Sequence, residues 1–251
     1  MLQSKKGRAL IGLTAILFFI AIAFYTTARA QVVNADEIIK MVNDWKAINL
    51  KYGQWIHVVS AITSETPNGV ILPDGQPMPS SYIQDDWFYI NKDGLVEKGV
   101  VSMKDNGGNI FQQSAYQNNI MINFTFGDRQ ENQQPYPLNI DFGFGDRILN
   151  AQSTGIAIEK SDGELKGKSS VIYSYIEKLK LPAQLGAENV IVDAITTKGY
   201  FDKETGDFVQ IQTIWTLANS REVVFESTEV ISIDSSLDAP DEILKVLEAV
   251  K

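Results

Sequence analysis

Two residue types that carry much of enzyme chemistry are scarce in this chain. It contains no cysteine, which excludes disulfides, thiolate metal sites and cysteine nucleophiles. Its single histidine, His57, excludes a cluster of imidazole metal ligands, and any Ser-His-Asp arrangement would have to use it. His57 lies within a predicted strand and no G-x-S-x-G motif accompanies it, which favours a half-buried polar residue over a general base. The sequence therefore predicts no catalytic residue, no metal site and no cofactor.

Positive charge is also scarce once the first 30 residues are set aside. Those residues contain four basic and no acidic side chains, so residues 31–251 carry 18 basic and 31 acidic side chains, a net charge of −13. A surface of this sign repels phosphate backbones and anionic membrane surfaces. We therefore expect no nucleic-acid partner, and we interpret the acidity as a solvated, soluble surface.

The N-terminus has the three parts of an export signal. Lys5, Lys6 and Arg8 precede an apolar run of 17 residues from Ala9 to Tyr25, and Ala28 and Ala30 have the spacing of an A-x-A cleavage site. The run is long for a cleaved signal and short for a membrane span, so residues 1–30 are predicted to be a signal peptide or an N-terminal membrane anchor. In both cases residues 31–251 form a single extracytoplasmic domain, either secreted, periplasmic or at the cell surface of a bacterial envelope. If the leader is retained, residues 9–25 anchor this domain to the membrane.

Residues 31–251 alternate turn residues with β-branched and aromatic segments. A helix is predicted from the capping residue Asn34 to Gly53, and a short amphipathic helix ends the chain after Pro240. Between them, about nine or ten strands in hairpins begin at Gln54. The expected fold class is mainly β with flanking helices (α+β), built on a long curved antiparallel sheet.

Aromatic side chains are abundant on the predicted strands. Some of them must fill a core, yet a long sheet with only two helices can leave part of its apolar face uncovered. Such a face either lines a ligand cavity or forms an interaction patch. The candidates for a ligand-binding apolar face are Trp55, Trp87, Phe124, Phe126, Phe142, Phe144, Tyr173 and Trp215.

A short repeat, Phe-x-Phe-Gly-Asp-Arg, occurs at residues 124–129 and again at residues 142–147. The second copy follows Asp141 and so contains Asp-Phe-Gly, the magnesium-binding triplet of protein kinases, but the other kinase motifs are missing. We interpret both copies as strands, each of which directs a phenylalanine pair to the apolar inside of the sheet. Gly127 and Gly145 would then mark the positions where the strands bend or stop.

Asp85 and Asp86 form an acidic pair in a predicted strand. Such a pair could bind a cation or supply acid–base chemistry. Successive strand residues point to opposite faces, however, so the two carboxylates cannot easily serve one site. This geometry favours solvated strand charges.

The order of elements and one turn resemble a known superfamily. The stretch GYFDKETGDFVQIQTIW has an aromatic residue and Asp202 at the end of a strand, then Thr205 and Gly206 in the turn to the next strand. In this it resembles the half-barrel superfamily of the lipoprotein carriers LolA and LolB and the RseB-like periplasmic regulators. The resemblance implies a half-barrel sheet whose concave apolar face holds acyl chains or a lipid-linked partner, without enzymatic activity.

Three hypotheses follow for the function. The first is an exported or membrane-tethered, non-enzymatic protein that binds a lipid, acyl chain or lipoprotein on the concave apolar face. The second is an envelope sensor or scaffold ectodomain that contacts a protein partner and has a packed interior. The third, a carboxylate-dependent enzyme such as a glycosidase, stays open only because carboxylate pairing in space cannot be read from a sequence.

Overall fold

The computed structural model describes residues 31–64, 72, 75–131, 140–185 and 188–250. Within these ranges no helix combines the length and the hydropathy that a membrane crossing requires. The predicted leader, residues 1–30, lies outside the described residues.

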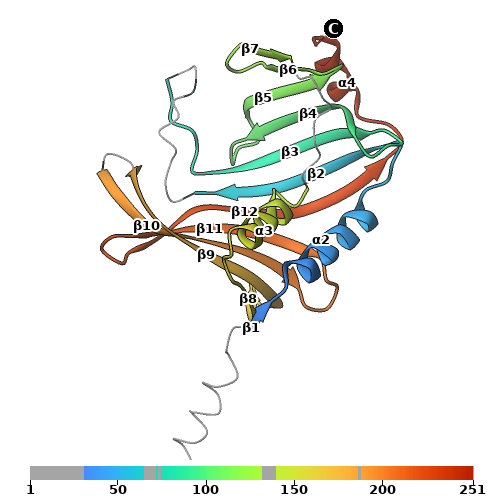
Figure 1. Cartoon of the computed structure of the whole chain (residues 1–251). Coiled ribbons are helices and arrows are strands. Elements are labelled where there is room, and N and C mark those ends of the chain that lie inside the picture. Colours follow the sequence, from blue (N-terminus) through green and yellow to red (C-terminus); the bar gives the residue numbers. More distant parts are fainter. Residues whose placement is uncertain (1–30, 65–71, 73–74, 132–139, 186–187, 251) are drawn as a thin grey trace, which may run out of the picture.

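All strands of the described ranges belong to one antiparallel sheet of twelve strands, which does not close (Figure 1). Its order is β1-β8-β9-β10-β11-β12-β2-β3-β4-β5-β6-β7. The strands are β1 (Gln31–Val33), β2 (Gln54–Thr63), β3 (Ser81–Ile90), β4 (Val96–Lys104), β5 (Ile110–Gln117), β6 (Ile120–Asn123), β7 (Asp128–Glu131), β8 (Ile158–Leu165), β9 (Lys168–Leu185), β10 (Glu188–Asp202), β11 (Phe208–Leu217) and β12 (Glu222–Ser236).

Two helices, α2 (Ala35–Asn49) and α3 (Phe144–Ser153), cover one face of this sheet, which we call the inner face (Figure 1). One connected apolar core joins the helices to side chains from Ile158 of β8 to Ile90 of β3. These two strands are separated by five others in the sheet, so the sheet must curve around the helix pair for both to reach one core. The predicted fold class, an open half-barrel with flanking helices, is confirmed.

The sequence of α2 explains its position. Asn34 caps the helix, because its side-chain oxygen accepts a hydrogen bond from the backbone N–H of Asp36 at 3.1 Å. Ile38, Val42 and Trp45 recur at helical spacing and are buried against the inner face. The predicted first helix is therefore confirmed.

A third helix, α4 (Asp241–Glu248), packs on the opposite face, which we call the outer face. Its Ile243 and Leu247 join a core with Trp55, Val100 and Ala115. Trp55 precedes Ile56, which belongs to the inner core, and adjacent residues of a strand point to opposite sides. The predicted C-terminal helix is confirmed, and the sheet has a separate core on each face.

The prediction that both phenylalanine repeats are strands is wrong. In the first copy β6 ends at Asn123, whose side chain accepts hydrogen bonds from the N–H groups of Thr125 at 3.1 Å and Phe126 at 3.3 Å. Gly127 then completes the turn with a φ of +71°. Phe124 and Phe126 are consequently 38% and 39% exposed in a turn, and neither lies on the inner face.

The second copy begins helix α3 instead of a strand. Asp141 Oδ2 accepts a hydrogen bond from the N–H of Gly145 at 2.8 Å, which satisfies a free donor of the first helical turn. Phe142 and Gly143 precede the helix with φ values of +50° and +77°. Phe144 and Ile148, one helical turn apart, are then fully buried.

Candidate functional site

The inner face beneath the helix pair is lined by aromatic rings. Phe201 of β10 and Phe208 of β11 meet edge to face, with ring centroids 5.2 Å apart. Tyr173 of β9 approaches Phe201 at 5.6 Å, and Trp45 of α2 approaches Phe208 at 5.5 Å. Such contacts stabilise a core beyond the burial of area, and they give the inner face a continuous apolar layer over three strands.

Phe144 of α3 fits into this layer at a glycine. A Cβ atom at Gly199 of β10 would lie 2.4 Å from the Phe144 ring, so the ring lies directly on the backbone of β10. The ring centroid is also 5.9 Å from that of Phe201 and 5.8 Å from that of Phe208. Gly199 therefore creates a slot in the inner face, and α3 fills that slot with one ring.

A buried ion pair holds α3 against α2. Lys46 Nζ of α2 lies 2.7 Å from Asp141 Oδ1, and the Asp141 side chain is 1% exposed. The approach of the ammonium to this oxygen is outside hydrogen-bond geometry, so the contact is an ion pair rather than an aligned hydrogen bond. The other carboxylate oxygen caps the helix, so Asp141 joins the start of α3 to α2.

Two surface clefts of about 370 Å³ each lie on either side of the turn between β10 and β11. Both are lined by Trp45, Thr205 and Asp207, and one of them also reaches Phe208. Thr205 belongs to this turn, in which Asp202 Oδ1 accepts a hydrogen bond from the N–H of Glu204 at 2.8 Å. Trp45 and Phe208 of the aromatic layer thus border a surface cleft beside this turn.

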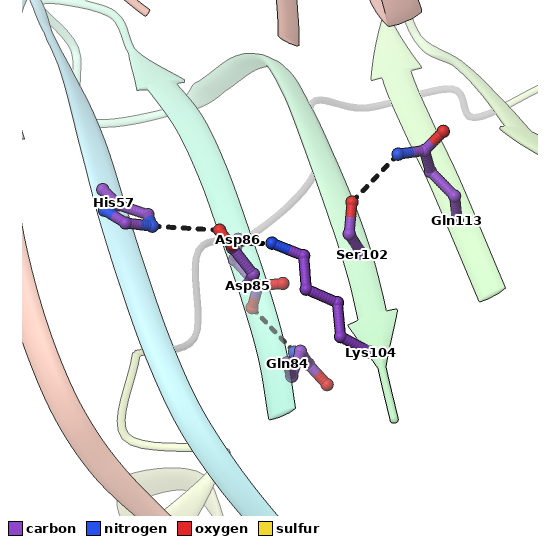
Figure 2. Close-up of polar contacts among 7 residues, drawn as sticks. All are labelled: His57, Gln84, Asp85, Asp86, Ser102, Lys104 and Gln113. Atoms are coloured by element: carbon purple, nitrogen blue, oxygen red, sulfur yellow. Dashed lines mark hydrogen bonds and ion pairs between the residues drawn. The ribbon is translucent and has the colours of Figure 1, made fainter. Parts of the chain in front are cut away.

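A polar network crosses the outer face at His57, Asp85 and Lys104 (Figure 2). His57 Nε2 lies 2.9 Å from Asp85 Oδ1, and Lys104 forms an ion pair with the other carboxylate oxygen of Asp85. The imidazole of His57 stacks on Trp87, with ring centroids 4.2 Å apart. Next to it, the Ser102 hydroxyl accepts a hydrogen bond from Gln113 at 3.0 Å. Asp85 has a cationic or hydrogen-bonding partner on each oxygen, which indicates a structural ion-pair network, and His57 is the half-buried polar residue that the sequence predicted.

Asp86 lies on the opposite face from Asp85, as strand alternation predicts (Figure 2). It is not solvated, contrary to the sequence interpretation: Asp86 is only 5% exposed. Burial raises its pKa to about 7, although a hydrogen bond from Gln84 Nε2 at 2.7 Å opposes the shift. Within the described ranges, no group of three or more histidine, aspartate or glutamate side chains could hold a metal ion.

The structure separates the eight predicted ligand-binding residues into four places. Phe142, Phe144 and Tyr173 contact the inner core. Trp55 and Trp87 belong to the outer-face core beneath α4. Trp215 stacks on Phe225, with ring centroids 4.2 Å apart, and belongs to a further apolar cluster close to the turn of the β9–β10 hairpin. Phe124 and Phe126 lie in the exposed turn.

Three residues of the inner face were missing from the predicted set. Trp45, Phe201 and Phe208 form the aromatic layer together with Phe144 and Tyr173. Trp45 could have been found from its place in the apolar stripe of the first helix. Phe201 and Phe208 could have been found from their positions on either side of the turn that contains Asp202, Thr205 and Gly206.

No family model matches the sequence, and the search of curated proteins found no match. Among solved structures, an uncharacterised conserved protein from Thermus thermophilus is similar at 8% identity and a TM-score of 0.40, over 83% of this chain and 93% of that one. The Mycobacterium tuberculosis lipoprotein LppX is similar at 11% identity and a TM-score of 0.35, over 81% and 95% of the two chains. A LolA superfamily protein from Nitrosomonas europaea is similar at 13% identity and a TM-score of 0.28, over 84% and 96%.

The solved structures to which this chain is similar thus include a member of the superfamily that the sequence resembles. Similarity at this level assigns neither a family nor a function to the chain.

Proposed function

We propose that this chain is an extracytoplasmic, non-enzymatic protein that binds a hydrophobic ligand on the inner face of its sheet. The ligand is a lipid, an acyl chain or the lipid part of a lipoprotein. Residues 31–251 form the binding domain, and residues 1–30 direct its export and, if they are retained, anchor it to the membrane.

The observation that carries this proposal is the contact of Phe144 with Gly199. The inner face contains an apolar slot that a side chain from the sheet does not fill, because Gly199 has none. The slot is filled by α3, which contacts α2 and the sheet through the apolar core, one buried ion pair with α2 and a hydrogen bond from Arg147 to Thr213 of β11. A methylene chain has the shape and the polarity to replace the ring if α3 moves away.

The clefts beside the β10–β11 turn supply a route from solvent to this layer. Trp45 and Phe208 both line one of the two clefts, and both belong to the inner core. The charged residues Lys168, Asp202 and Asp207 also line this cleft. An apolar chain with a polar end could therefore enter here and keep its polar end hydrated.

The test combines analysis of the purified protein with a matched pair of variants. Lipids extracted from the protein are identified by mass spectrometry, and uptake of a fluorescent fatty acid is titrated. Phe144→Ala empties the slot and should raise fatty-acid affinity several-fold, at a cost in stability of about 3–5 kcal/mol. Adding Gly199→Ala places a methyl group in the emptied slot and should lower the affinity again.

Phe126→Ala serves as the control, because Phe126 lies in an exposed turn and its removal should leave uptake unchanged. Circular dichroism verifies that each variant is folded. Repeated recovery without lipid, together with no fatty-acid uptake by the wild type or by Phe144→Ala, would contradict the proposal.

The packed inner core favours a second candidate, an envelope sensor or scaffold that contacts a protein. Phe144, Phe201 and Phe208 are each at most 2% exposed, so the inner face is filled as it stands. N-terminal sequencing of the exported protein separates the two candidates cheaply. A chain that starts at Gln31 suits a mobile carrier, whereas a retained leader suits a tethered sensor.

A further inference from the structure

Two buried polar atoms on the inner face have no protein hydrogen-bond partner within the described residues. They are Asp86 Oδ1 on β3 and Ser60 Oγ on β2. Ser60 is 0% exposed and Asp86 is 5% exposed. A buried polar atom without a partner costs about 1–3 kcal/mol, so each is expected to have one.

The two side chains lie close enough to share one partner. Gln84 is the register partner of Ser60, and Val58 is the register partner of Asp86. Ser60 and Asp86 are therefore diagonal neighbours on one face of adjacent strands, roughly 7–8 Å apart at the backbone. Both point inward, so a single hydroxyl or ammonium group between them can contact both oxygens.

The surroundings of this pair are apolar and continue to the inner core. Val58, opposite Asp86 on one side, belongs to the inner core, while Val101, opposite it on the other side, lines a small pocket. Phe88 and Met121 also line that pocket, which has a volume of about 30 Å³ and extends the apolar surroundings on the β4 side of Asp86. A small group held at Asp86 would thus lie beside Val58, at the edge of the inner core.

We propose that Ser60 and Asp86 bind the polar head group of the hydrophobic ligand, and that this head group donates hydrogen bonds. Hydroxyl and ammonium groups meet this requirement: either can donate to Asp86 Oδ1, and a hydroxyl oxygen can also accept from Ser60. A carboxylate does not meet it, because it has no proton to donate and is repelled by an ionised Asp86. The inference rests on the proposed function, since it names the head group of the ligand that occupies the inner face.

The experiment compares two ligands that differ only in their head groups. Dodecanol and dodecanoate are used at pH 8 to displace a bound fluorescent fatty acid from the wild-type protein. We expect dodecanol to displace the probe at about tenfold lower concentration, the effect of one hydrogen bond to a charged acceptor. Dodecylamine should resemble dodecanol.

Asp86→Asn should bring the two ligands to within about two- to threefold of each other, since the repulsion of dodecanoate is removed. Ser60→Ala should weaken dodecanol more than dodecanoate. Asp85→Asn is the matched control, because it removes a neighbouring carboxylate on the outer face and should leave the preference unchanged.

The outcomes separate this inference from the proposed function. If all three ligands displace the probe equally, or if Asp86→Asn leaves the preference intact, the site holds only a buried water and the inference is overturned while the proposed function stands. If the wild type binds no probe and no dodecyl ligand, both are overturned.

Discussion

Asp85 and Asp86 are neighbours in the chain, yet β3 turns them into different environments. Asp85 reaches His57 and Lys104 on the outer face, where its charge is balanced. Asp86 faces the apolar inside of the sheet, and Gln84 is the one described side chain with which it forms a hydrogen bond. A charge on Asp86 therefore costs folding free energy, whereas a charge on Asp85 is stabilised.

This difference predicts an unusual dependence of stability on pH. The pKa of Asp86 is about 7 in the folded protein and 3.8 in the unfolded chain, so between these values the folded state holds a proton that the unfolded state has lost. The contribution of Asp86 to the free energy of unfolding is therefore largest in acid. It declines as the pH rises toward 7, by up to about 4 kcal/mol. Asp86→Asn should remove the decline, so the variant should match the wild type at pH 4 and exceed it at pH 8.

Urea unfolding at a series of pH values measures the effect. Asp85→Asn should lose stability at pH 8, because its carboxylate has two partners. Parallel pH profiles for Asp86→Asn and the wild type would show that Asp86 is not held in an apolar environment.

The face of β3 on which Asp86 lies could have been read from the sequence, but its burial and its lack of a second hydrogen-bond partner could not. Tyr82, Gln84, Asp86 and Phe88 alternate along β3, and this period of two places Asp86 on the same face as two aromatic side chains. Whether that face is solvated depends on what covers it. The lack of a partner for Asp86 depends on the neighbouring strands β2 and β4, which a pattern within one strand does not contain.

At the scale of elements, the ion pair between Lys46 and Asp141 reinforces the apolar contacts that pack α3 against α2. Lys46→Met would leave Asp141 buried without its cation, and breaking a buried pair costs about 3–5 kcal/mol. Amide hydrogen exchange in α3 should then become faster than in the sheet, since Asp141 also fixes the first turn of this helix.

Lys40→Met is the control from the same helix. Lys40 pairs with Asp44, but the two side chains are 76% and 62% exposed, so the loss should stay below about 0.5 kcal/mol. Equal effects of the two substitutions would mean that the ion pair does not hold α3 in place.

Helix α3 is also the element that sequence reasoning missed. The alternation of Phe142 with Phe144 matches a strand, whereas the spacing of Phe144, Ile148 and Ala151 matches a helix. The carboxylate of Asp141 favours the helix, because it accepts a hydrogen bond from a backbone N–H of the first helical turn. Its position four residues before Gly145 was visible in the sequence. The helices α2 and α4 and the hairpins of the last third were predictable, because their caps and turn residues lie within or directly beside the elements themselves.

At the scale of the whole molecule, the inner core connects elements from both halves of the sequence. Hydrogen bonds run without interruption from β1 to β7, and the inner core takes residues from α2, β2 and β3 as well as from β8 to β12. We therefore predict that residues 31–251 unfold in a single cooperative transition. Differential scanning calorimetry should show one peak with equal calorimetric and van't Hoff enthalpies. Two resolved peaks would indicate that β2–β7 and β8–β12 are separate folding units.

Strands β12 and β2 pair in the middle of the sheet, although they come from opposite ends of the domain's sequence. Trp55 lies opposite Ser236 and Thr63 opposite Ser227, whereas most other strand pairs are hairpins between consecutive strands. Bringing two such distant segments together lowers the entropy of the chain before the new contacts stabilise it. The pairing of β12 with β2 is therefore expected to form late in folding. Until it forms, β2 and β12 are open edges, and β2 is rich in β-branched and aromatic residues. A newly synthesised chain is therefore most prone to aggregation in the interval before its two halves join.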